Sequence, residues 1–91
     1  MYYTLSMINN LDIFKKKLLY RASYRGTKEM DILLSSFVKR HINKFDSELL
    51  KELEAFLSFE DEIILNFYNF SISKKNIEKN KVSKIFKDFK I

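Results

Sequence analysis

The stretch from residue 27 to residue 42 reads TKEMDILLSSFVKRHI. Large apolar side chains recur in it at intervals of three and four residues, which places them on one face of an α-helix. We therefore predict a helix over residues 27–42 with an inward face formed by Met30, Leu33, Leu34, Phe37, Val38 and His41. Since one helix cannot bury this face alone, the rest of the chain must supply its partners.

Residues 11–24 and 46–57 show the same periodicity on either side of this stretch. The first segment predicts a helix, capped by Asn9 or Asn10 and ended by the lone glycine, whose inward residues are Leu11, Phe14, Leu18 and Ala22. The second predicts a helix that Asp46 or Ser47 caps and that ends near Leu57. These two helices are the nearest candidates to cover residues 27–42.

Two shorter helices complete the pattern. Ser58 and Asp61 have the spacing of a capping box, which predicts a fourth helix that forms a tight hairpin with the third. Residues 82–89 carry apolar side chains at helical spacing among lysines, and we expect this basic amphipathic helix to be the least firmly packed.

The composition favours an all-α domain. The 91 residues are 46% hydrophobic and include no proline and a single glycine, Gly26, so the chain lacks the turn residues that a β-domain needs. A chain of this length forms one core at most. We predict a small five-helix bundle over residues 1–91, with residues 1–8 as a candidate flexible extension because Met7 is an alternative start.

The residue types argue against an enzyme. Cysteine is absent, which excludes disulfides, thiolate metal sites and thiol catalysis. His41, the single histidine, lies on the apolar side of its helix and is interpreted as structural. Glu60, Asp61 and Glu62 are consecutive, so their side chains point in different directions. We predict no catalytic, metal or cofactor-binding residues.

Charge leaves two alternative function classes open. The net charge is +5, but residues 29–62 carry four basic and nine acidic side chains, while both ends are basic. A small basic helical module that binds nucleic acid is therefore the alternative, although its best hairpin would repel phosphate. A peripheral membrane protein would use residues 82–89. No apolar run is long enough to span a bilayer and no secretory signal is recognised, so we expect a cytoplasmic protein without membrane insertion.

Residues 21–31 form the densest polar stretch and surround the only glycine. Arg25 leaves one helix, Glu29 enters the first turn of the next, and Gly26 between them allows a close approach of another backbone. One interpretation is a docking corner for a partner. The other is a local salt bridge between Arg25 and Glu29 beside a glycine that ends a helix. Composition alone favours neither interpretation over the other.

The sequence YRGTKEMD at residues 24–31 resembles the Arg-Gly-x-x-Glu signature of the SdhE family of succinate dehydrogenase assembly factors. Arg21, one turn earlier, and the acidic pair within residues 56–68 support the resemblance. Phe67 departs from it, since the family typically carries a tryptophan at this place.

The resemblance implies a function in binding. Members are five-helix bundles without activity of their own that bind the flavoprotein subunit of succinate dehydrogenase, in some bacteria also that of fumarate reductase. They promote covalent attachment of FAD to a histidine of that subunit. The resemblance implies no cofactor bound stably by the chain itself, and we expect a monomer in the free state and no nucleic acid as partner.

The resemblance also implies a set of partner-binding residues. Arg25 is expected in the interface with a bidentate contact to a partner carboxylate or to backbone carbonyls, and Glu29 is expected to meet a partner donor or to lock Arg25. Asp31 either joins the interface or orients the junction. The full set is Arg25, Gly26 and Glu29, followed in rank by Arg21, Tyr24, Lys28 and Asp31.

Overall fold

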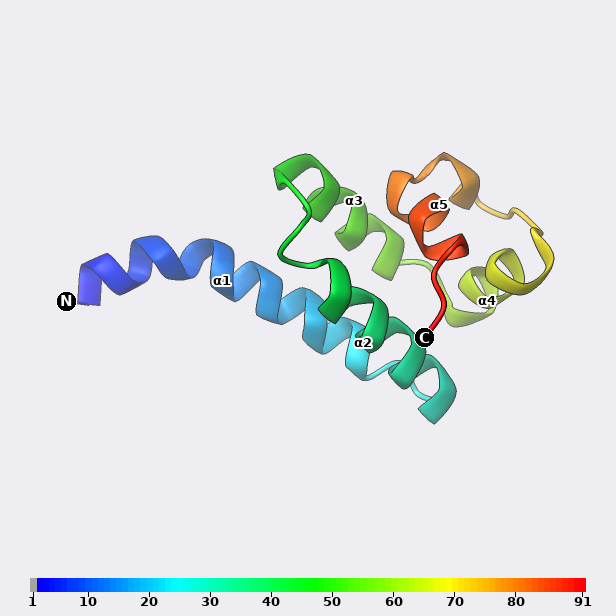
Figure 1. Cartoon of the computed structure of the whole chain (residues 1–91), viewed down its shortest axis with the longest axis horizontal. Coiled ribbons are helices and arrows are strands. Elements are labelled where there is room, and N and C mark those ends of the chain that lie inside the picture. Colours follow the sequence, from blue (N-terminus) through cyan, green and yellow to red (C-terminus); the bar gives the residue numbers. More distant parts are fainter. Residues whose placement is uncertain (1) are drawn as a thin grey trace.

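Five α-helices joined by short loops make up the protein (Figure 1). The computed structural model describes residues 2–91, with side chains described from residue 10 onward. The helices are α1 (Tyr2–Ser23), α2 (Lys28–His41), α3 (Ser47–Leu57), α4 (Asp61–Phe70) and α5 (Lys81–Lys87), and the 3-10 turn η1 (Ile77–Lys79) precedes α5. No strand occurs within residues 2–91, and the predicted all-α fold with five helices is confirmed. Only η1 had no counterpart in the prediction.

Helix α1 is longer than its periodicity indicates. It begins at Tyr2, well before the predicted start at Leu11, because the segment contains no glycine or proline to interrupt it. Its first turns extend away from the other helices (Figure 1). Leu18 and Ala22 are buried as predicted, but Leu11 is 48% exposed, so its predicted inward position is wrong. At this end α1 extends beyond the shorter helices that could cover it.

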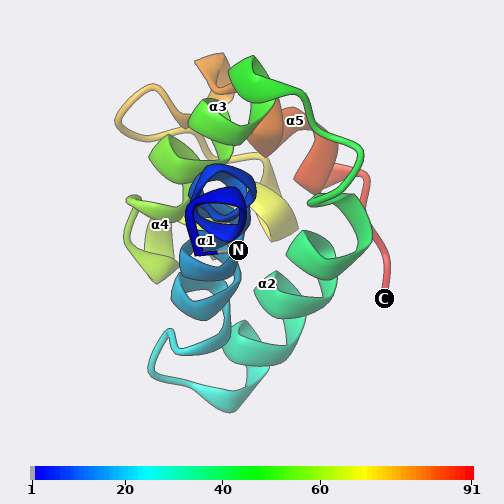
Figure 2. The same cartoon turned by 90° about the vertical axis from the view of Figure 1, so that its left-hand side faces the viewer.

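Helices α1 and α2 form the most extensive helix pair and lie side by side in both views (Figures 1 and 2). The glycine between them adopts φ +117°, a backbone conformation that ends α1 and reverses the chain. The Thr27 hydroxyl then accepts a hydrogen bond from the Met30 amide at 3.3 Å and caps α2. The predicted inward face of α2 is largely confirmed: four residues are buried and two half-buried, namely Met30, Leu34, Phe37 and Val38, and Leu33 and His41.

The start of α3 agrees with the prediction, whereas the start of α4 does not. The Asp46 carboxylate accepts a hydrogen bond from the Leu49 amide at 2.9 Å and caps α3. Ser58 belongs to the end of α3, where its hydroxyl donates to the Glu54 carbonyl at 3.0 Å, and Glu60 is the residue before α4. The predicted capping box is therefore wrong. The tight hairpin is also not formed, because α3 packs on α5 and α1, and α4 packs on α5 and η1.

The core is built from aromatic rings around Phe37. Its ring centroid lies 6.3 Å from that of Phe56, 5.1 Å from that of Phe86 and 5.3 Å from that of Phe89. Val82 and Phe86 of α5 are fully buried. Helix α5, expected to be loosely packed, is thus central to the core, because it fills the space between α3 and α4. Within residues 2–91 no helix has the length and apolar character needed to cross a membrane.

Candidate functional site

The turn between α1 and α2 is the exposed corner of the molecule. Gly26 is exposed, and a Cβ atom built on it would meet no other atom within 4 Å. The space above this backbone is therefore open to a partner. A side chain at this position would still be strained by the positive φ.

Arg25, next to this glycine, is turned into the molecule. Only 10% of its side chain is exposed, and its Nε lies 2.8 Å from the Asp61 carboxylate. Its Nη1 donates to the Leu57 carbonyl at 2.7 Å, and its Nη2 donates to the Phe59 carbonyl at 2.8 Å. The guanidinium thus satisfies the carbonyls at the end of α3 and ties them to α1.

This geometry gives Arg25 a role inside the chain. Its guanidinium donates to the Asp61 carboxylate and to two main-chain carbonyls, so these donors already have acceptors in the free chain. The alternative salt bridge with Glu29 is not formed, since Asp61 is the carboxylate partner. Arg25 thus holds the corner in place, and its contact with a partner stays a prediction.

Asp31 and Arg21 brace the same junction. The Asp31 carboxylate accepts a hydrogen bond from the Arg25 amide, which holds the turn against the first turn of α2. This is the orienting contact considered for Asp31, whose role in the interface stays a prediction. Arg21 donates from Nη2 to the Ser58 hydroxyl at 3.1 Å and adds a second tie between α1 and the end of α3.

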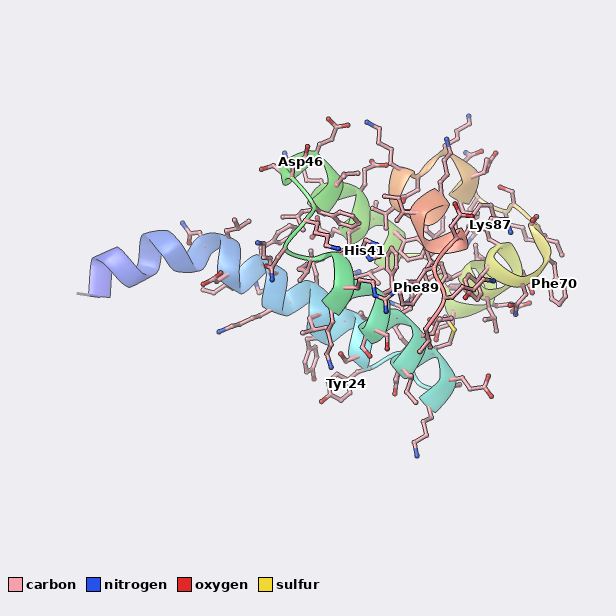
Figure 3. All side chains as sticks on the ribbon, in the orientation of Figure 1. Tyr24, His41, Asp46, Phe70, Lys87 and Phe89 are labelled. Atoms are coloured by element: carbon pink, nitrogen blue, oxygen red, sulfur yellow. The ribbon has the colours of Figure 1, made fainter. Side chains whose placement is uncertain are left out.

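The remaining predicted residues point outward. Tyr24 is 69% exposed and lies on the outside of the helix pair (Figure 3). Lys28 and Glu29 are exposed, and their side chains make no hydrogen bond or ion pair with residues 10–91. The structure therefore divides the predicted set into an outer group, the contact corner, formed by Tyr24, Gly26, Lys28 and Glu29, and an inner group formed by Arg21, Arg25 and Asp31.

Four partners of the inner group were not predicted as site residues: Ser58, Asp61 and the carbonyls of Leu57 and Phe59. The sequence does contain a signal for Asp61, because the acidic pair in residues 56–68 belongs to the resemblance. Hydrogen bonds to main-chain carbonyls do not depend on the residue type of the acceptor, so a sequence pattern could not predict them.

Two further residues have structural roles. The Nδ1 atom of His41 lies 3.0 Å from the Phe37 carbonyl, and its ring packs on Phe37 and Phe45, which agrees with the interpretation of His41 as structural. Phe67, at the place of the family tryptophan, is only 6% exposed and has the Lys87 ammonium 5.5 Å from its ring centroid. A phenylalanine therefore fills this core position.

The basic C-terminal helix does not offer an apolar face to a membrane. Val82 and Phe86 of α5, and Phe89 just after it, are buried in the core. The Lys81 ammonium forms an ion pair with Glu48. These contacts remove the basis for membrane binding through residues 82–89.

Comparisons with known proteins identify the family. The model of the Sdh5 family, described as flavinator of succinate dehydrogenase, matches residues 16–90. A mitochondrial succinate dehydrogenase assembly factor 2 from Schizosaccharomyces pombe is 38% identical over 77 residues, which cover 85% of this chain and 54% of that protein. The FAD assembly factor SdhE of Acetobacter pasteurianus is 36% identical over 53 residues, which cover 58% of this chain and 49% of that protein.

A second fungal protein, succinate dehydrogenase assembly factor 2 from Schizosaccharomyces japonicus, is 38% identical over 53 residues, covering 58% of this chain and 37% of its own length. The chain thus spans between 37% and 54% of the length of these three relatives. No solved structure gives a significant match. Because the family model covers most of the sequence, this chain belongs to the Sdh5 family, the family of SdhE and of succinate dehydrogenase assembly factor 2.

Proposed function

We propose that this chain is an assembly factor that binds the flavoprotein subunit of succinate dehydrogenase and promotes covalent attachment of FAD to that subunit. Membership of the Sdh5 family over residues 16–90 is the observation that carries the proposal. A role toward the flavoprotein subunit of fumarate reductase, which the resemblance implies for some bacteria, stays a prediction.

The contact corner supports a role in binding. It presents an open glycine backbone between an exposed tyrosine ring and an exposed carboxylate, Glu29. This backbone is held in place by the hydrogen bond from the Arg25 amide to Asp31 and by that from the Arg25 side chain to Asp61. A surface that is rigid before binding loses little conformational entropy when the partner docks.

The chain acts on its client through binding energy and supplies no reacting group. Its single histidine is packed among aromatic rings and hydrogen-bonded to its own helix. We propose that the chain binds one arrangement of the client's domains more tightly than the others and so raises the population in which the client's own histidine and flavin can react.

The fungal relatives are named as mitochondrial proteins. For this chain the cytoplasm, expected from the sequence, stays a prediction, as do the monomeric free state and the absence of a stably bound cofactor. The nucleic-acid alternative has no support in the comparisons.

The test of this function is a binding measurement with purified proteins. The chain and the flavoprotein subunit, both treated with nuclease, are mixed and analysed by size-exclusion chromatography and isothermal titration calorimetry. A stoichiometric complex is expected. Two separate peaks and no heat of binding, with a folded subunit, would show that this subunit is not the client.

A further inference from the structure

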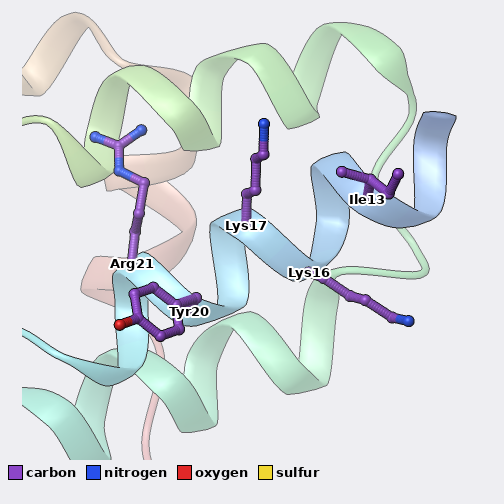
Figure 4. Close-up of a pocket in the computed structure, with 5 residues that line it drawn as sticks. All are labelled: Ile13, Lys16, Lys17, Tyr20 and Arg21. Atoms are coloured by element: carbon purple, nitrogen blue, oxygen red, sulfur yellow. The ribbon is translucent and has the colours of Figure 1, made fainter. Parts of the chain in front are cut away.

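A groove on the outer face of α1 has no role in the contact corner. It measures about 420 Å³ and is lined by Ile13, Lys16, Lys17, Tyr20 and Arg21 (Figure 4). Ile13 is 48% exposed and Tyr20 is 65% exposed, so two large apolar groups form its floor without cover from the rest of the described chain.

Positive charges border this apolar floor on both sides. Lys17 and Arg21 point to one side of α1 and Lys16 points to the other, with Tyr20 between them (Figure 4). The side chains of Lys16 and Lys17 form no hydrogen bond or ion pair with residues 10–91. An occupant must therefore present apolar side chains flanked by negative charge on both sides.

The spacing of the floor residues suits a helix. Ile13 and Tyr20 are seven residues apart, which is two helical turns or about 10 Å. A helix that lies along such a surface contacts it with residues i, i+3 or i+4, and i+7. An acidic amphipathic helix of two to three turns matches both the apolar floor and the charged borders.

The groove continues into the contact corner. The ring of Tyr20 packs on the ring of Tyr24, with centroids 4.6 Å apart, and Tyr24 lies two residues before the open glycine. A client bound at the corner therefore lies next to the groove.

A nucleic acid fits this surface less well. The pocket beside Tyr24 and Arg25 is lined by Glu60 and Asp61. A polyanion that extended along α1 beyond the groove would approach these carboxylates. A short acidic helix can end before it reaches them.

We propose that the α1 groove binds an acidic amphipathic helix of the flavoprotein subunit, as a second contact beside the corner. This proposal rests on the proposed function, since it names a further surface for the same client. It assigns a binding role to Ile13, Lys16, Lys17 and Tyr20, none of which belongs to the Arg-Gly-x-x-Glu motif.

The test compares two double variants with equal change in charge. Lys16→Glu/Lys17→Glu alters the groove, and Lys79→Glu/Lys84→Glu alters two exposed lysines on η1 and near the centre of α5. Affinity for the flavoprotein subunit is measured by calorimetry at low and at physiological salt, and folding is checked by circular dichroism.

We expect the groove variant to bind about 10-fold more weakly or worse at low salt and to lose most of the salt dependence of the wild-type chain, with little effect in the control variant. Ile13→Ala/Tyr20→Ala should weaken binding with the salt dependence retained. Equal weakening in both charge variants, or none in either, would overturn the groove proposal while wild-type binding upholds the proposed function. A wild-type chain that does not bind the subunit would overturn the proposed function itself, and the groove proposal with it.

A competition experiment addresses the other class of partner. A 20-nucleotide single-stranded DNA is titrated into the complex at physiological salt. We expect the complex of the chain with the flavoprotein subunit to persist. Displacement of the subunit, with tight binding of the oligonucleotide that depends on Lys16 and Lys17, would show that the groove is a nucleic-acid site instead.

Discussion

The guanidinium of Arg25 lies 2.8 Å from the carboxylate of Asp61, and this ion pair joins the turn after α1 to the start of α4. The same guanidinium donates to the carbonyls of Leu57, at the end of α3, and of Phe59, just after it. One side chain thus connects the turn beside the contact corner with α3 and α4. The arginine of the family motif is, in this chain, a structural support for the surface that the glycine and glutamate expose.

Replacement of Arg25 by alanine should destabilise the fold. It leaves Asp61 and the carbonyls of Leu57 and Phe59 without their donor, and such a loss at a largely buried site costs about 2–4 kcal/mol. The measurement is urea unfolding of the wild type, Arg25→Ala, Asp61→Asn and the double variant, which form a double-mutant cycle. A change below about 0.5 kcal/mol in Arg25→Ala, together with lost client binding, would instead place Arg25 in the interface.

Substitutions at Gly26 distinguish the effect of backbone strain from that of close contact with the client. Alanine and arginine both incur the same backbone strain at φ +117°, about 1–3 kcal/mol, and neither Cβ meets a neighbour. We expect similar unfolding free energies for Gly26→Ala and Gly26→Arg. Client binding, measured by calorimetry, should be at least about 10-fold weaker in the arginine variant than in the alanine variant, because only arginine fills the open space. Equal affinities of the two variants would argue against close approach at this corner.

Glu29 should affect binding and leave stability unchanged. It is exposed and makes no ion pair with the described side chains, so Glu29→Gln should alter the unfolding free energy by less than about 0.5 kcal/mol. We expect a clear loss of affinity for the flavoprotein subunit. Glu62→Gln, an exposed residue in the first turn of α4, is the matched control and should bind as the wild type does. Unchanged affinity in Glu29→Gln would remove this residue from the interface.

Phe37 holds the aromatic core together. Its side chain is fully buried against Phe56, Phe86 and Phe89, so Phe37→Ala should cost about 3–5 kcal/mol in urea unfolding. Phe70→Ala, at a position that is 67% exposed, should change the unfolding free energy little. Comparable losses in the two variants would mean that the core is not centred on Phe37.

The sequence predicted best those features that depend on local periodicity. Helix α2 spans residues 28–41, within one residue of each predicted bound, and Asp46 caps α3 as expected. Two other predicted caps failed, because α1 begins before Asn9 and Asn10 and Ser58 does not cap α4. The contacts that Arg25 makes within the chain could not be predicted, for a physical reason. Arg25 is close in sequence to Glu29, but its acceptors lie 32 to 36 residues away in the chain. The spacing of residue types within one segment does not indicate such long-range hydrogen bonds.

The position of α5 was mispredicted for a related reason. Its many lysines indicated a solvated helix, yet Val82, Phe86 and Phe89 fill the core. Apolar spacing shows which face of a helix is inward, but the depth of burial depends on which helices cover that face.

Covalent flavin fluorescence tests the central claim most directly. The flavoprotein subunit is produced with no factor, with the wild-type chain, or with the Gly26→Arg or Gly26→Ala variant. Its flavin fluorescence is then recorded in a denaturing gel loaded with equal amounts of the subunit. We expect a strong flavin band with the wild-type chain, a background band without it or with Gly26→Arg, and a band with Gly26→Ala well above background. An equally strong band in the absence of the chain would contradict the account.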